Sequence, residues 1–278
     1  MKKLVLLTTC IFLFYSCSKP KNSTITISGS TTVLPVVSKA AELYKKSHPD
    51  VKIIVNAGGS GVGINQLGSH KTTIGMASRD ITLKEIEQYP NTTFITHSIG
   101  KDAVVPVVSS EIYDSGITAL TLEQIAKIYK GEITNWKQLN GPDKDILVID
   151  KEKSRGTRHV FMKYVMRNKE AEAAGADLVL GSNNEEQTAI VQSDATIGML
   201  SNAWLNKDVK GISIVMPNGD SIQPTLQNIV NGTFPITRNL LLITNGEPQG
   251  ETKKFIDFIF SKEGQKIVTQ SGYVSINQ

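Results

Sequence analysis

One local pattern occurs three times in this chain and limits its fold more than any other feature. In each copy a strand-like run ends, small hydroxyl or glycine residues turn the chain, and a helix-like segment begins. The first copy has a strand at 24–28, the turn Gly29-Ser30-Thr31-Thr32, and a helix at 33–47 whose apolar residues recur at helical spacing. Strands that alternate with helices in this way predict the α/β class with parallel sheets.

The second and third copies differ from the first in the chemistry of their turns. A strand at 51–55 leads into a glycine-rich turn that contains Ser60, ahead of a short helix at 62–67. A strand at 146–149 leads into a turn at 150–158 and a helix at 158–166. This third turn combines small residues with cations, and its candidate ligands are Lys151, Ser154, Arg155, Gly156, Thr157 and Arg158.

All three turns are suited to binding an oxyanion. A helix start presents unpaired backbone N–H groups and about half a positive charge, and nearby hydroxyl groups add further donors. The guanidinium of Arg155 can bind an oxyanion through two parallel hydrogen bonds. Each turn also has a purely structural interpretation, in which Ser30 or Thr31 caps a helix, the glycines only turn the chain, and the cations lie on the surface.

The rest of the chain continues the alternation of strands and helices. A buried strand at 73–77 is followed by Ser78-Arg79-Asp80 and by a helix that Thr82 and Glu85 cap. The remaining expected elements are strands at 93–99, 103–108, 195–200, 212–216 and 240–244, helices at 121–129 (capped by Thr121 and Gln124) and 185–192, and a helix pair at 255–270 broken at Gly264; Trp136 and Trp204 are assigned to packing.

The first residues predict export from the cytoplasm. Lys2 and Lys3 precede an apolar run at 4–15, which is too short for a membrane-spanning helix and indicates a signal peptide at 1–16. Without this segment the formal charge falls from +4 to +2, because two lysines and no acids are removed. No cluster of basic residues suggests a nucleic acid as a partner.

Both cysteines of the chain lie in this leader region. Cys17 follows a small residue, as in the bacterial lipobox, so we expect it to be lipidated and to anchor the protein through a tether at 17–23. Phe14 and Tyr15 depart from that motif, which leaves an ordinary cleaved signal as the alternative. Because the other cysteine is Cys10, the rest of the chain can form no internal disulfide.

A catalytic interpretation competes with simple binding. Ser30 or Ser60 could be the nucleophile of a phosphoryl or acyl hydrolase, but a serine needs an activating base. Among the four histidines, His159 is the only plausible base, because it follows the third turn directly. The histidines also lack the paired spacing of zinc ligands, so we expect neither a metal nor another cofactor.

Taken together, the ordered motifs resemble the phosphate-binding proteins that serve bacterial ABC importers. The resemblance extends over nearly the whole chain after the leader. The matching segments are 29–35, 58–61, 74–79, 131–136, 154–158, 195–200 and 258–265.

This resemblance implies a two-lobed periplasmic-binding-protein type II fold, with two mixed sheets flanked by helices. The chain would cross between the lobes near 104–106 and again near 235–239. Lobe 1 would then comprise 24–105 plus 240–278, and lobe 2 would comprise 106–239. A ligand in the cleft would touch both lobes and favour the closed form.

The resemblance also implies a set of ligand-binding residues, with two departures from the family pattern. Lys151 stands where an arginine is usual, so Arg155 could take over the bidentate role. Arg79 stands where many members have an aspartate that accepts the proton of hydrogen phosphate and rejects sulfate, with Asp80 next in the chain. The full expected set is Ser30, Thr31, Thr32, Ser60, Ser78, Arg79, Asp80, Lys151, Ser154, Arg155, Gly156 and Thr157.

The expected function is capture of inorganic phosphate without chemistry and its delivery to an ABC permease. The protein would act as a monomer in the cell envelope, lipid-anchored at the periplasmic or extracellular face. Alternatives are a binding protein for another oxyanion such as sulfate, a serine-dependent phosphate-ester hydrolase, and a sensor that presents its bound form to a receptor.

Overall fold

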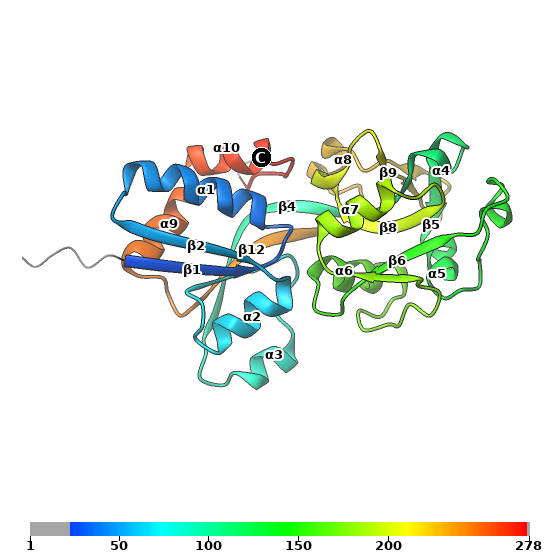
Figure 1. Cartoon of the computed structure of the whole chain (residues 1–278). Helices are drawn as coiled ribbons and strands as arrows, with labels where there is room; N and C mark the ends of the chain where they lie inside the picture. The colour runs from blue at the N-terminus through cyan, green and yellow to red at the C-terminus, as the bar shows by residue number, and fades with distance from the viewer. Residues whose placement is uncertain (1–22, 277–278) are drawn as a thin grey trace, which may run out of the picture.

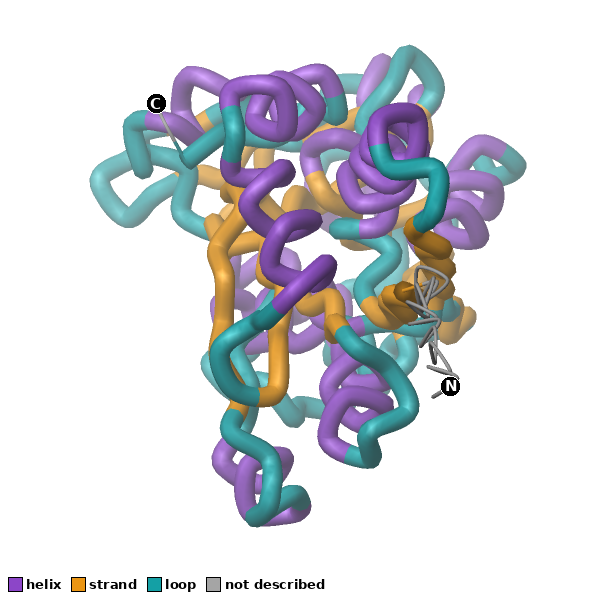
Figure 2. The backbone as a smooth tube through the Cα atoms, turned by 90° about the vertical axis from the view of Figure 1, so that its left-hand side faces the viewer, coloured by secondary structure: helices purple, strands orange, loops and turns teal. Residues whose placement is uncertain are grey.

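The structure is a computed structural model that describes residues 23–276. The predicted signal peptide, Cys17 and most of the tether lie outside the described residues. Two lobes stand side by side, and two long strands, β4 (Phe94–Ser109) and β12 (Thr237–Asn245), run between them (Figure 1). In the perpendicular view of Figure 2, helices surround the central strands. No helix formed by the described residues is both long and apolar enough to cross a bilayer.

Lobe 1 is built on the strand order β2-β1-β3-β12-β4. The strands β1 (Ser23–Gly29), β2 (Val51–Ala57) and β3 (Ile74–Ala77) are parallel, whereas β12 is antiparallel to β3 and to β4. One face packs on α1 (Leu34–Ser47), α9 (Gly250–Phe260) and α10 (Lys262–Gln270), and the other on α2 (Ser60–Gly68), with α3 (Leu83–Gln88) beyond it. The buried apolar residues of this lobe come from both ends of the chain.

Lobe 2 continues the same sheet through β4 to β8 (Thr196–Ser201), β6 (Leu147–Lys151) and β7 (Leu178–Leu180), with β9 (Val209–Gly211) also paired to β4. A three-stranded sheet lies beside it, formed by β5 (Ala119–Thr121), β10 (Ser213–Val215) and β11 (Ser221–Ile222). Its helices are α4 (Ser110–Asp114), α5 (Leu122–Tyr129), α6 (Gly156–Val165), α7 (Asn183–Val191) and α8 (Leu226–Val230), with short 3-10 turns at Trp136–Leu139 and Asn202–Trp204. The lobe has its own core, which includes the fully buried Trp136.

The mixed α/β class predicted from the sequence is confirmed, but pure parallel pairing is not. Four of the pairings that hold the large sheet together are antiparallel, and all four involve β4 or β12. The expected strands at 93–99 and 103–108 form one strand, β4, because residues 100–102 stay paired with β12 through an irregularity at Leu240 and Leu241. This continuous strand joins the two expected sheets into one sheet of nine strands.

Local capping signals largely match the structure. The capping boxes of Thr82 with Glu85 and of Thr121 with Gln124 are both present. The break in the C-terminal helix pair was predicted at Gly264, and this is wrong: it lies at Ser261, whose hydroxyl caps α10 by accepting the Gly264 N–H. Gly264 serves instead in close packing, since a Cβ there would lie 2.3 Å from the carbonyl oxygens of Phe258 and Ile259.

Candidate functional site

A small cavity lies between the lobes, where the N-terminal ends of α1, α2, α6 and α7 converge. Each of these helices follows a strand and a short turn, and a helix start leaves its first backbone N–H groups without partners inside the helix. The lining residues are Ser30, Thr31, Thr32, Gly59, Ser60, Ser78, Lys151, Arg155, Gly156, Thr157, Gly181 and Asn183. We call this space the central cavity.

The lobe 1 wall of the central cavity consists of buried hydroxyl groups. The Ser30 hydroxyl donates to Ser78 Oγ at 3.0 Å, and the Ser78 N–H donates to Ser60 Oγ at 3.0 Å. All three side chains are buried, and none carries a charge. Such a wall offers donors that can reorient toward an anion at little desolvation cost.

A glycine fixes the backbone of this wall. Gly29, at the end of β1, has φ +138°, and a Cβ there would lie 2.2 Å from the Met76 carbonyl oxygen. The chain then turns so that the Ser30 N–H donates to that same oxygen at 2.9 Å. Only glycine therefore fits where the first turn begins.

The lobe 2 wall is in direct contact with lobe 1. A Cβ at Gly156, the first residue of α6, would lie 2.3 Å from Ser60 Oγ. The Ser154 carbonyl oxygen accepts the Gly61 N–H at 2.9 Å, which is a backbone hydrogen bond between the lobes. The structure therefore has the two lobes closed on each other around the central cavity.

Two threonines and an arginine connect the two lobes at one side of the central cavity. Thr32 of lobe 1 and Thr157 of lobe 2 have their hydroxyl oxygens 3.5 Å apart. Arg238, on β12, donates to both hydroxyls at 3.3 and 3.1 Å. Its guanidinium is fixed by a bidentate pair with the fully buried Asp102 of β4, at 2.7 and 2.9 Å. Asn183 adds a hydrogen bond from its side-chain amide to the Thr32 hydroxyl at 3.2 Å.

The lobe 2 wall supplies the cations, and each one has its own carboxylate partner. Lys151 is 1% exposed and forms an ion pair with Glu186, which is fully buried. Burial raises the pKa of Glu186, and the Lys151 ammonium opposes that shift. The other Glu186 oxygen accepts the Met199 N–H at 2.6 Å.

Arg155 lies closer to the mouth of the central cavity. Its guanidinium pairs with Glu152 at 2.6 and 2.8 Å. Its side chain packs on Gly59 of lobe 1 and on Gly181 of lobe 2, where an added Cβ would approach it to 2.8 Å in both cases. Arg155 therefore spans the closed entrance between the lobes.

Nine of the twelve residues expected to bind the ligand line the central cavity, and three do not. Ser154 contributes its carbonyl to the contact with Gly61 beside the cavity. Arg79 forms a bidentate pair with Glu85 at 2.7 and 2.9 Å, and both Arg79 and Asp80 line a different cavity. Arg158, the third cation of its turn, is committed to the buried Asp150 and to the Ala171 carbonyl.

Sequence reasoning missed four residues at or behind the central cavity. Gly181 and Asn183 start α7, and their signal was readable: Ser182 and Glu185 form a capping box after the short strand β7. Arg238 and Asp102 lie 136 positions apart in the chain, and neither belongs to a local motif. Only the pairing of β4 with β12 brings them together.

Comparison with known proteins gives consistent relatives. Residues 17–263 match the PBP superfamily domain. The phosphate-binding protein PstS of Borreliella burgdorferi is 35% identical over 289 residues and covers 99% of both chains. The phosphate-binding protein PstS of Bacillus subtilis is 33% identical, with 92% of this chain and 81% of the relative covered.

Solved structures show the same relationship. A chain from Clostridium perfringens, assigned to phosphate ABC transport as a substrate-binding protein and solved with bound phosphate, superposes with a TM-score of 0.81 at 32% identity. The match covers 91% of this chain and 100% of that one. An ABC-type phosphate transport receptor from Vibrio cholerae gives a TM-score of 0.72 at 33% identity, covering 90% and 99%.

Proposed function

We propose, from the premise that this chain belongs to the PstS family of phosphate-binding proteins within the PBP superfamily, that its central cavity captures inorganic phosphate. The captured ion would be passed to the permease of an ABC importer. Two relatives carry these roles in their names, and one of them was solved with phosphate bound.

One observation carries the proposal: among residues 23–276, none of those that line the central cavity has a carboxylate. The lining consists of hydroxyl groups, helix-start N–H groups, an amide and two cations. The carboxylates of Glu186 and Glu152 pair with those cations and are not part of the lining. Such a lining offers hydrogen-bond donors to an anion and places no negative charge against it.

The closed contacts explain how binding could be signalled. The ligand would touch Ser30 and Ser60 of lobe 1 and Thr157 of lobe 2, so it binds the closed form better than the open form. That difference in affinity is the energy available to shift the lobes. A permease that recognises the closed form would then receive only loaded protein.

The cellular setting is part of the same proposal. A lipid on Cys17 would hold the protein, as a monomer, at the periplasmic or extracellular face of the cell envelope. Metabolic labelling with a palmitate analogue, in cells that express the full chain, tests this point. Label that persists after Cys17→Ser would remove the anchor from the proposal.

Calorimetry tests the binding itself. We expect the domain from residue 23 onward to bind one phosphate ion per chain, and Ser30→Ala to weaken the binding. Absence of heat from phosphate between micromolar and millimolar concentration would contradict the proposal.

Sulfate requires a parallel titration, because Asp80 lines another cavity and no carboxylate of the described residues lines the central cavity to accept a ligand proton. Rejection of sulfate would then rest on geometry alone. We expect sulfate to bind more weakly than phosphate but measurably, and equal affinity for the two ions would favour a general oxyanion-binding protein.

The hydrolase alternative receives little support from the site. Its one candidate base, His159, lines the same separate cavity as Asp80 and not the central cavity that holds Ser30 and Ser60. Burial, followed by the charge of Arg79, lowers the pKa of His159 to about 4. Turnover of a chromogenic phosphate ester that requires both Ser30 and His159 would revive this alternative.

A further inference from the structure

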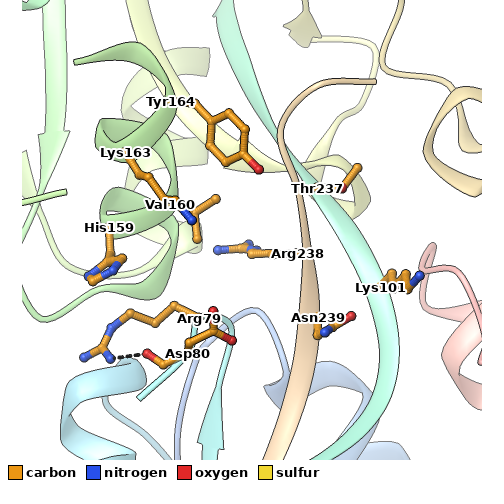
Figure 3. A pocket seen from close by; sticks show the side chains of 10 residues that line it. All are labelled: Arg79, Asp80, Lys101, His159, Val160, Lys163, Tyr164, Thr237, Arg238 and Asn239. Atoms are coloured by element: carbon orange, nitrogen blue, oxygen red, sulfur yellow. Dashed lines mark hydrogen bonds between the residues drawn. The ribbon is translucent and has the colours of Figure 1, made fainter. Parts of the chain in front are cut away.

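A second cavity lies beside β4 and β12, the two strands that cross between the lobes and form the hinge. Arg238 separates it from the central cavity. Figure 3 shows this hinge-side cavity between α6 and β12, with Arg238 and Lys163 directed into the space and Asp80 at its lower edge. The residues that line it are Arg79, Asp80, Lys101, His159, Val160, Lys163, Tyr164, Thr237, Arg238 and Asn239. It has contributions from lobe 1, from lobe 2 and from both crossing strands.

The lining of the hinge-side cavity carries more cations than carboxylates. It contains Arg79, Lys101, Lys163 and Arg238, against the single carboxylate of Asp80. Two of these cations form ion pairs with carboxylates outside the lining, Arg79 with Glu85 and Arg238 with Asp102. The Nε of Arg79 is buried and has no hydrogen-bond partner among the described residues. A buried donor without a partner costs free energy, so a ligand that supplied an acceptor would be favoured.

Several groups around the hinge-side cavity lack partners within the described part of the chain. The exposed Lys163 forms no ion pair with another described residue, and its one aromatic contact there places Nζ 5.9 Å from the centroid of the Tyr164 ring. The exposed Asp80 carboxylate accepts no hydrogen bond from residues 23–276, and Arg79 donates to the Asp80 backbone oxygen. Lys163 and Tyr164 of lobe 2 therefore supply unused donors, and Asp80 of lobe 1 supplies an unused acceptor.

This combination selects a particular kind of ion. A fully ionised oxyanion would meet the cations but would be repelled by Asp80. An oxyanion that keeps an O–H group can donate that proton to Asp80 while its other oxygens accept from Lys163, Tyr164 and Arg238. Hydrogen phosphate has this form at neutral pH, whereas sulfate does not.

We propose that the hinge-side cavity is a second, weaker binding site for a protonated oxyanion, with hydrogen phosphate as its ligand. Asp80 accepts the ligand's proton, and Lys163 and Tyr164 bind its remaining oxygens. Because these three residues come from both lobes, an ion at this site also stabilises the closed form. Arg238 donates to Thr32 and Thr157 on its other side, so the two sites share one fixed guanidinium.

Equilibrium dialysis of the full chain with radiolabelled phosphate tests the second site. From micromolar to tens of millimolar phosphate, we expect a tight class of one ion per chain followed by a weak class of one more. Lys163→Gln and Tyr164→Phe should each weaken the second class about tenfold or more and leave the first unchanged. Lys207→Gln, an exposed lysine of the same lobe that does not line the cavity, is the matched control and should change neither class.

Sulfate separates this site from general anion attraction. With the central cavity filled by phosphate, sulfate should not occupy the weak class in the wild-type protein, and Asp80→Asn should admit it. A single class of phosphate up to tens of millimolar would overturn the proposal. So would a weak class that survives both Lys163→Gln and Tyr164→Phe, or one that takes sulfate as well as phosphate. None of these outcomes depends on the tight class, whose absence would instead contradict the proposed function.

Discussion

The two walls of the central cavity present hydrogen-bond donors of different chemistry. The lobe 1 wall presents Ser30, Ser60 and Ser78, which hydrogen-bond to one another and carry no charge. The lobe 2 wall presents Lys151 and Arg155, each paired with its own glutamate. The lobe 1 wall is neutral and its hydroxyl groups hydrogen-bond to one another, whereas the cations of the lobe 2 wall depend on ion pairs.

Because of this difference, we expect the two walls to contribute differently to ligand binding and to the stability of the fold. The buried hydroxyl groups of the lobe 1 wall hydrogen-bond to one another, so this wall is built without a charge in the core. A buried cation is tolerated only with a partner, which is why Glu186 must be buried along with Lys151. Changes in lobe 2 should therefore affect stability as well as binding, and changes in lobe 1 mainly binding.

Lys151→Met should give the largest effect and is the strongest test of this contrast. We expect the binding free energy for phosphate to weaken by about 2–5 kcal/mol. The free energy of unfolding should also fall by about 3–5 kcal/mol, because Glu186 is left buried without its partner. Calorimetry and urea unfolding measure the two quantities separately.

The double variant Lys151→Met with Glu186→Gln is the control for that experiment. Glutamine removes the unpaired charge and keeps an oxygen for the Met199 N–H, so stability should recover while binding does not. Recovery of phosphate affinity in the double variant would show that Lys151 acts only through Glu186.

Arg155→Ala should weaken phosphate binding by about 2 kcal/mol, since a charge-assisted donor is lost at the mouth. Unlike Lys151, its partner Glu152 is half exposed, and pairs of this kind contribute little to stability. The urea midpoint should therefore stay close to that of the wild type. A marked loss of stability would place Arg155 in the same class as Lys151 and erase the distinction within lobe 2.

Removing single hydroxyl groups should have smaller effects. Ser30→Ala and Thr157→Ala are each expected to weaken phosphate binding by about 1–2 kcal/mol, the usual range for one neutral donor. Ser221→Ala, on an exposed edge strand away from the cavity, is the matched control. If the loss of the Ser30 hydroxyl exceeds the effect of Arg155→Ala in calorimetry, the neutral wall and not the charged one dominates binding.

The smallest expected effect concerns pH and lies on the hinge side of lobe 2. Burial lowers the pKa of His159 to about 4 from 6.5, so the unfolded chain binds more protons than the folded protein between these values. His159 thus contributes stability that is present above pH 6.5 and lost as pH falls toward 4. Allowing for its partial exposure, His159→Gln should flatten the stability profile by about 1 kcal/mol. Parallel urea-unfolding profiles from pH 7 to 4 would contradict this expectation.

The parts of the site that sequence reasoning located are those encoded locally. The turns at Gly29, Ser60 and Gly156 each follow a strand and start a helix, and such junctions are recognisable within about ten residues. The capping boxes of α3 and α5 were recognisable for the same reason. The start of α7 follows the same rule, and the capping box of Ser182 and Glu185 would have revealed it.

The parts that sequence reasoning placed differently depend on where side chains point. Arg79 follows Ser78 directly after β3, yet Ser78 lines the central cavity whereas the guanidinium of Arg79 pairs with Glu85. Lys151 and Arg158 belong to one turn, but Arg158 is held by Asp150 on the opposite side. Proximity in sequence does not show which side chain will face the cavity, because even consecutive residues of one strand, such as Asp150 and Lys151 of β6, point to opposite faces.

By itself, the sequence determined the α/β class, the succession of strands and helices, and the three donor-rich turns, because each depends on residues near one another in the chain. Only the tertiary structure decided that the turns meet in one closed cavity and that Glu186 neutralises Lys151. It also decided that Arg238 and Asp102 form an ion pair next to this cavity. The physical reason is that partners far apart in sequence become neighbours only through sheet pairing and lobe closure. No local pattern contains that information.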